Sequence, residues 1–65
     1  MLRAYVREDI KRDGLDEKKG AILYLDIKED EVDVYKYLGG ESKLSFVGWL
    51  ANTPNNKEIQ IMKEL

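Results

Sequence analysis

Three short apolar runs separated by turn signals constrain the fold of this chain more than any other feature. They cover residues 20–28, 32–38 and 44–50, and they are rich in β-branched and aromatic side chains. Runs of this length and composition predict β-strands. Glu29-Asp30 and Gly39-Gly40 separate them, and glycine accepts the positive φ that tight turns need. The middle of the chain therefore predicts three antiparallel strands joined by two hairpins.

The flanking segments carry weaker patterns. Residues 2–7 alternate between apolar side chains and others, which indicates a half-buried strand. Residues 8–19 are polar with Gly14 near their centre, and we interpret them as a loop with room for a short helical turn at its start. Residues 58–65 fit a strand through Ile59 and Ile61, or a short helix through Ile59 and Met62, and we favour the strand.

Together these elements predict an all-β fold, either a small antiparallel meander or a five-stranded barrel. Residues 1–65 would form a single small β domain. The alternative fold class is α+β, with a short C-terminal helix over the last eight residues.

Hairpin geometry predicts which residues lie opposite each other. A loop centred on Glu29-Asp30 gives the pairs Tyr24–Tyr35, Leu25–Val34, Asp26–Asp33 and Ile27–Val32. A four-residue loop at 39–42 gives Tyr35–Phe46, Tyr37–Leu44 and Val32–Trp49. A two-residue loop there would shift the partners but keep the faces, because the side-chain period of a strand is two.

Alternation then divides the apolar side chains between an aliphatic and an aromatic face. The aliphatic face would carry Ala21, Leu23, Leu25, Ile27, Val32, Val34, Leu38, Val47 and Trp49. The aromatic face would carry Ile22, Tyr24, Tyr35, Tyr37, Leu44, Phe46 and Leu50. A sheet with one wet face would show polar residues on that side. Both predicted faces therefore need cover, from the terminal strands, a second copy of the chain, or another partner.

The absence of cysteine and histidine narrows that choice. A chain of 65 residues usually needs a disulfide, a structural metal or a partner subunit for stability. Without cysteine there is no disulfide, and without histidine the usual zinc and copper ligands are missing. We therefore expect a partner subunit, with a homodimer as the simplest form, and no cofactor.

Catalysis is not expected. Nucleophile–base pairs with histidine or cysteine cannot form, and neither Ser42 nor Ser45 has an evident base. Gly39-Gly40 lacks the spacing and the lysine of a phosphate-binding loop. The chain is therefore predicted to be a non-enzymatic binding protein.

The leading functional interpretation is a protein-interaction module that self-associates through its aromatic face. Aromatic residues and arginine are enriched at protein interfaces. The predicted interface or binding residues are Tyr24, Tyr35, Tyr37, Phe46, Trp49, Arg3, Tyr5 and Arg7. Trp49 fits a core position and an interface anchor equally well, and Gly48 beside it indicates a bulge or a close approach by another backbone.

A small β-barrel that binds single-stranded nucleic acid is the first alternative, because the same aromatic side chains could stack on bases. Against it stand the net charge of −2 and the acidic run over residues 29–33. We interpret that run as a solvated hairpin tip; a patch that meets a basic protein surface is the sharper possibility.

The second alternative is a metal-dependent nuclease fragment. Asp26 and Asp33 are expected to lie opposite each other, where they could bind Mg²⁺ or Ca²⁺, although a solvated strand end beside Lys28 is favoured. Asp26-Ile27-Lys28 resembles the carboxylate-x-lysine element of PD-(D/E)xK nucleases, with Asp13 or Asp16 as the upstream acid.

The apolar runs are far shorter than the ~20 residues of a membrane span. The N-terminal residues show no signal-peptide pattern. We therefore expect a cytoplasmic protein with no membrane partner.

Overall fold

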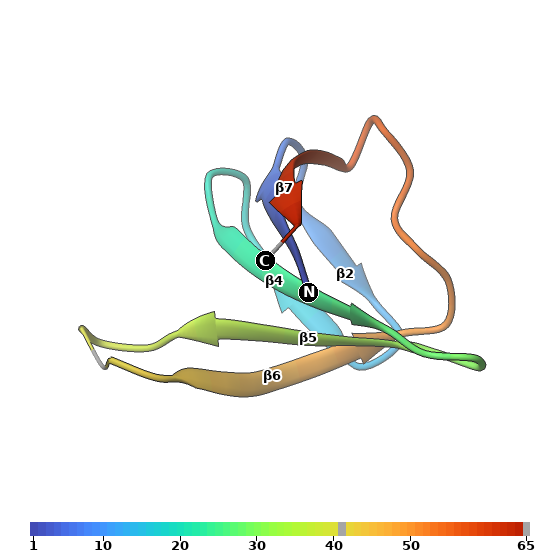
Figure 1. Ribbon diagram of the computed structural model, residues 1–65. Helices are drawn as coiled ribbons and strands as arrows, with labels where there is room; N and C mark the ends of the chain where they lie inside the picture. The colour runs from blue at the N-terminus through green and yellow to red at the C-terminus, as the bar shows by residue number, and fades with distance from the viewer. Residues whose placement is uncertain (41, 65) are drawn as a thin grey trace.

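The computed structural model describes residues 1–40 and 42–64, and these residues are built from strands (Figure 1). The strands are β1 (Leu2–Val6), β2 (Ile10–Arg12), β3 (Leu15–Glu17), β4 (Ile22–Ile27), β5 (Val32–Tyr37), β6 (Leu44–Leu50) and β7 (Ile59–Glu64). The described residues contain no helix, and so none that could cross a membrane. The all-β prediction is confirmed, and the α+β alternative is wrong because the last segment is β7.

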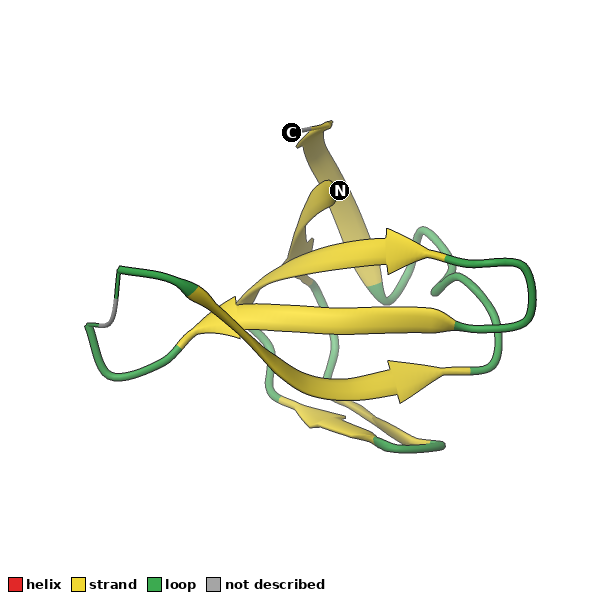
Figure 2. Cartoon of the chain, turned by 60° about the horizontal axis from the view of Figure 1, so that its bottom comes forward, coloured by secondary structure: helices red, strands yellow, loops and turns green. Residues whose placement is uncertain are grey.

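Five strands form one antiparallel sheet in the order β6-β5-β4-β1-β7, and β2 pairs with β3 in a separate hairpin. The β4–β5–β6 meander is the predicted one. β1 pairs with both β4 and β7, so the first and last strands lie side by side. Figure 2 shows these two strands, at the chain ends marked N and C, turned steeply away from the meander. The five-stranded sheet is therefore curled.

Residues 8–19, predicted as a loop, contain the β2–β3 hairpin instead. Arg12 pairs with Leu15 across the two-residue turn Asp13-Gly14, and Asp13 has a positive φ of 53°. Asp-Gly is a strong hairpin signal, and in this turn the positive φ is adopted by Asp13 and not by Gly14. Ile10 and Leu15 are buried in the core. The hairpin therefore covers one side of the sheet.

The two sides of the five-stranded sheet differ in cover. We call the side turned toward the β2–β3 hairpin the inner face and the opposite side the outer face. Leu23, Leu25 and Val34 on the inner face are buried, whereas Tyr37 and Phe46 on the outer face are exposed. The core as a whole comprises Ala4, Val6, Ile10, Leu15, Leu23, Leu25, Val32, Val34, Leu50 and Ile59.

The predicted register is confirmed for β4 and β5, which pair Tyr24–Tyr35, Leu25–Val34, Asp26–Asp33 and Ile27–Val32. The pairs Tyr35–Phe46 and Tyr37–Leu44 between β5 and β6 are also confirmed. Tyr24 and its neighbour Leu25 therefore point to opposite faces. The two apolar faces that the alternation predicts are present, but within the single chain the outer face is not covered as the inner face is.

The predicted pair Val32–Trp49 is wrong. The register shifts between Val34 and Tyr35, where Val47 is the extra residue of a bulge in β6, and beyond it Val32 pairs with Leu50. One extra residue moves every following side chain to the other face. Leu50 is consequently buried on the inner face, whereas Trp49 stands on the outer face, 41% exposed. Trp49 is not a core residue.

Two glycines allow the hairpin to approach β6 closely. The Gly14 amide donates a hydrogen bond to the Trp49 carbonyl at 3.2 Å. A Cβ atom on Gly48 would clash with the Gly14 carbonyl oxygen, and one on Gly14 would clash with the Trp49 indole. Both expectations for Gly48, a neighbouring bulge and a close backbone approach, are confirmed.

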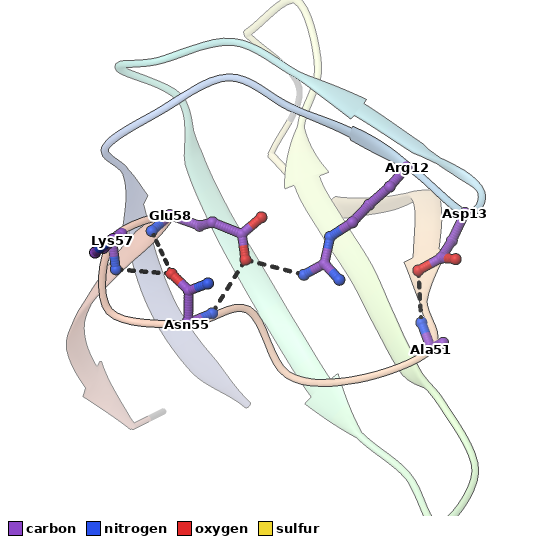
Figure 3. Close-up of polar contacts among 6 residues, drawn as sticks. All are labelled: Arg12, Asp13, Ala51, Asn55, Lys57 and Glu58. Atoms are coloured by element: carbon purple, nitrogen blue, oxygen red, sulfur yellow. Dashed lines mark hydrogen bonds and ion pairs between the residues drawn. The ribbon is translucent and has the colours of Figure 1, made fainter.

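The hairpin is also tied to the segment between β6 and β7 (Figure 3). Arg12 Nη2 lies 3.0 Å from Glu58 Oε1, and Asp13 Oδ2 accepts a hydrogen bond from the Ala51 amide at 3.0 Å. Asn55 Oδ1 accepts bonds from the amides of Lys57 and Glu58, at 2.8 and 3.1 Å, and so fixes the turn before β7. The β2–β3 hairpin, which covers the inner face, is therefore bonded to both ends of the segment between β6 and β7.

Candidate interaction surface

A row of four residues crosses the outer face in register. Arg3 pairs with Tyr24, Tyr24 with Tyr35, and Tyr35 with Phe46, on strands β1, β4, β5 and β6. The rings of Tyr35 and Phe46 meet edge to face, with centroids 5.6 Å apart. Tyr24 contacts Tyr37 in the same way at 5.5 Å. The predicted aromatic residues are thus brought together on one face.

A hollow of about 510 Å³ opens beside this row. Its walls include the side chains of Arg3, Ile22, Tyr24, Tyr37 and Met62. Met62 reaches it from β7, where the pairing with β1 shifts between Arg3 and Ala4. Arg3 Nε is buried there, and no described residue provides it with a hydrogen-bond partner. The hollow therefore combines apolar walls with Arg3, whose Nε is itself buried from solvent.

The next row of the outer face is acidic. Asp26 pairs with Asp33, and Asp33 pairs with Trp49. Lys28 Nζ lies 3.3 Å from Asp26 Oδ2, and this hydrogen bond together with the charge of Asp26 raises the pKa of Lys28. Asp33 Oδ1 is buried and, among the described residues, has no hydrogen-bond partner. Lys28 therefore pairs directly with Asp26, and its charge also attracts Asp33.

Glu31 extends this negative charge. A hydrogen bond with Asp33 raises the pKa of Glu31, since it favours the protonated form; partial burial and the charges of Asp33 and Asp30 act in the same direction. The acidic end of the outer face is thus electrostatically crowded, whereas Arg3 lies two strands away.

The carboxylates do not assemble into a metal site. In residues 1–40 and 42–64 no three aspartate or glutamate side chains are arranged to hold a metal ion. Asp13, one of the two candidates for the upstream acid of the nuclease resemblance, accepts a hydrogen bond from the Ala51 amide at the hairpin tip, and the other, Asp16, pairs with Lys11 in that hairpin. Nothing in this arrangement supports the nuclease alternative.

The remaining predicted residues are placed differently from one another. Tyr5 pairs with Ile22 and continues the outer face from the row of Arg3. Arg7 follows β1, and its Nη1 donates to the Asn56 carbonyl at 3.0 Å. Arg7 is therefore engaged by the segment before β7 and is not part of the row.

One serine has a lysine opposite it. Ser45 pairs with Lys36, a proximity that the sequence did not indicate. Lys36 Nζ, however, lies 2.9 Å from Oε1 of the buried Glu17, so its ammonium group is held in an ion pair. This pairing makes Lys36 a poor general base for Ser45.

Sequence reasoning missed Met62 as a wall of the hollow, and it treated Asp33 as a metal-ligand candidate and as part of the acidic run. Met62 depends on a register shift between β1 and β7, which no local pattern indicates. Comparison with known protein families, curated proteins and solved structures finds no match to this chain.

Proposed function

We propose that this chain is a non-catalytic protein-interaction module that self-associates through its outer face. The observation that carries the proposal is the unequal cover of the sheet. The chain's own hairpin covers most of the inner face, with Ile27 as an exposed exception, whereas Tyr37, Trp49 and Phe46 on the outer face stay 48, 41 and 56% exposed. Contiguous exposed apolar surface of this kind marks interaction sites on small proteins.

The size of the molecule sets what such an interface requires. A stable interface buries about 800 Å² on each partner. That is roughly a fifth of the 4317 Å² surface of this chain. An interface of that size would need a whole face of the molecule, and the outer face carries the aromatic residues Tyr24 and Tyr35 on its inner strands β4 and β5. Aromatic centres of this type carry most of the binding free energy at interfaces.

Single-stranded nucleic acid is the competing ligand for the same residues. The row of Tyr24, Tyr35 and Phe46 beside Arg3 favours base stacking. The adjoining row of Asp26 and Asp33 opposes it, because it would repel the phosphate backbone. A protein partner accommodates both rows, and this is why we place it first.

Sedimentation equilibrium between 1 µM and 1 mM tests the proposal. We expect reversible dimerisation of the wild-type chain in this range, and about a tenfold or larger loss of affinity in Phe46→Ser, which removes an aromatic ring that is 56% exposed on the outer face. Ile27→Ser is the matched control, since Ile27 is comparably exposed (51%) but belongs to the opposite side of β4.

Two outcomes would count against self-association through the outer face. The wild-type chain could remain monomeric over the whole range, or Ile27→Ser could weaken dimerisation as much as Phe46→Ser. A monomer whose Trp49 fluorescence responds to a single-stranded oligonucleotide, with a strong dependence on salt, would favour the nucleic-acid alternative.

A further inference from the structure

The hollow beside the aromatic row is large enough for a small molecule. Its volume of about 510 Å³ falls within the range of about 300–1,000 Å³ that is typical of ligand pockets. Apolar and aromatic side chains from three strands border it, Ile22 and Tyr24 from β4, Tyr37 from β5 and Met62 from β7. The rings of Tyr24 and Tyr37 meet edge to face, so each limits the movement of the other. The hollow therefore offers apolar surface to a flat ligand.

Arg3 is the cation of the hollow that lacks a counter-charge. Lys36 also borders the hollow, but its Nζ lies 2.9 Å from Glu17 Oε1, so its charge is compensated. Among the described residues, none forms an ion pair with Arg3. Arg3 Nε is buried, whereas its two terminal nitrogens are not among the buried atoms that lack a partner. An anion in the hollow can therefore reach the guanidinium end-on, through Nη1 and Nη2.

A second cation lies opposite Arg3. Lys63 of β7 pairs with Arg3 of β1, and Lys63 has no acidic partner in the described part of the chain. Asp26, an acid of the outer face on the neighbouring strand β4, is paired with Lys28. Like charges directly opposite each other on adjacent strands are destabilising. This end of the outer face therefore carries positive charge that an anion would compensate.

We propose that the hollow binds a small, flat, apolar anion, with its carboxylate held end-on by Arg3 and its apolar body against Tyr24, Tyr37 and Met62. The two terminal nitrogens of a guanidinium match the two oxygens of a carboxylate, which is why arginine recognises this group. A long polyanion fits less well, because the acidic row adjoins the aromatic row. This ligand site goes beyond the proposed self-association and does not depend on it.

Titration with 1-naphthoate, followed by NMR, tests the site. The readout is the ε-methyl signal of Met62, which is told apart from that of Met1, the other methionine, by its loss in Met62→Leu. We expect a ring-current shift of this signal with a dissociation constant of about 1 mM or tighter, as for a small ligand of this size. Two further probes divide the interaction into its parts. 1-Naphthalenemethanol keeps the rings without the charge, and inorganic phosphate keeps a charge without the rings; each should bind about tenfold more weakly or worse.

Two arginine variants test the role of the charge. Arg3→Gln should weaken 1-naphthoate binding about tenfold or more, because it removes a charge-assisted contact. It should leave the binding of 1-naphthalenemethanol unchanged, which shows that the hollow is intact. Arg7→Gln is the matched control, since it changes the net charge equally but Arg7 is bound to the Asn56 carbonyl, outside the hollow. It should bind 1-naphthoate as the wild type does.

Two aromatic variants test the position of the ligand. Tyr37→Ser removes a ring that borders the hollow and should weaken 1-naphthoate binding several-fold. Phe46→Ser removes a comparably exposed ring of the same face that does not border it, and should bind the probe as the wild type does. Because Phe46→Ser is also the variant expected to disrupt the dimer, normal binding by it supports the hollow whether or not the chain self-associates.

Three results would overturn the proposal. The Met62 signal could stay unshifted at millimolar 1-naphthoate, or the wild type could bind 1-naphthalenemethanol as tightly as 1-naphthoate. Binding could also be lost in Phe46→Ser as strongly as in Tyr37→Ser, which would place the probe on the wider aromatic face instead of in the hollow. Each of these results leaves the sedimentation test of self-association unaffected, and a monomeric wild-type chain in that test leaves the ligand site unaffected.

Discussion

The two faces of the five-stranded sheet come from the same strands but meet different surroundings. Consecutive residues alternate between them, so Leu23 is buried on the inner face while its neighbour Tyr24 is half exposed on the outer face. The inner face is closed by the β2–β3 hairpin through Ile10 and Leu15. The outer face keeps its aromatic side chains at the surface. One sheet thus provides both a core and a surface of similar apolar character.

This difference separates folding from association. Leu23, Leu25 and Val34 on the inner face are buried within one chain, so their contribution to stability does not depend on protein concentration. Burial of the outer face requires a partner, so its contribution follows mass action. Substitutions on the two faces should therefore report on different equilibria, although the residues are adjacent in sequence.

The largest expected effect comes from truncating one residue on each face. Leu23→Ala should lower the free energy of unfolding by about 2–5 kcal/mol, because it leaves a cavity in the core. Phe46→Ala should cost less than about 1 kcal/mol at concentrations where the chain is monomeric, since its ring is 56% exposed. Urea unfolding followed by circular dichroism measures both. Equal losses would show that the outer face is covered within the monomer.

The close approach of the hairpin to β6 gives the next effect. Gly48→Ala should cost about 1–3 kcal/mol, because the new methyl group meets the Gly14 carbonyl, a backbone atom that cannot rotate away. Gly14→Ala meets the Trp49 indole, a side chain that can turn outward, so its cost should be smaller. Urea unfolding ranks the two variants.

Trp49 fluorescence provides a second readout of that contact. In Gly14→Ala, displacement of the indole into solvent should shift its emission to longer wavelength. Unchanged emission in Gly14→Ala together with unchanged stability in Gly48→Ala would mean that the hairpin is not closely packed on β6. The inner face would then lack the cover that distinguishes it from the outer face.

The meander was predictable because its information is local. The runs around Leu25 and Val34 alternate over six residues. Lengthening or shortening the turn between them by two residues would change the partners but leave every side chain on the same face. Counting residues outward from the two hairpin turns gives the pairs Tyr24–Tyr35 and Tyr35–Phe46. The aromatic part of the candidate surface could therefore also be predicted from the sequence.

The remaining features depend on contacts between distant segments. β2 and β3 are three residues each, too short to show a period, although the Asp13-Gly14 turn signal is present. The bulge that exchanges Trp49 and Leu50 sits where Gly48 meets the hairpin, a tertiary contact. The hollow beside Arg3 requires β1 to lie between β4 and β7, which hairpin arithmetic does not predict.

The smallest expected effects concern two carboxylates. Asp9 directly precedes the β2–β3 hairpin, and Glu31 directly precedes β5 at the acidic end of the outer face. The Lys19 amide, which donates to Asp9 Oδ1 at 2.8 Å, lowers the pKa of Asp9, and Lys18 at 3.7 Å adds to this. Glu31 is the opposite case, because its hydrogen bond to Asp33 and the like charges nearby raise its pKa. The surroundings of Asp9 thus favour its ionised form, whereas the surroundings of Glu31 disfavour its ionised form.

The two shifts predict opposite dependences on pH. The lowered pKa of Asp9 contributes stability at neutral pH that is lost as the pH falls below 3.8 through the folded-state value. Asp9→Asn should therefore be slightly less stable than the wild type at pH 7 and equal to it at pH 2.

The raised pKa of Glu31 means that the folded state binds its proton more tightly, so its ionisation lowers stability as the pH rises above 4.5. Glu31→Gln should be slightly more stable at pH 7, with the gain disappearing by pH 3. Thermal unfolding of monomeric protein across this range measures both variants. If both substitutions changed the stability at pH 7 in the same direction, the electrostatic contrast between the surroundings of Asp9 and those of Glu31 would be contradicted.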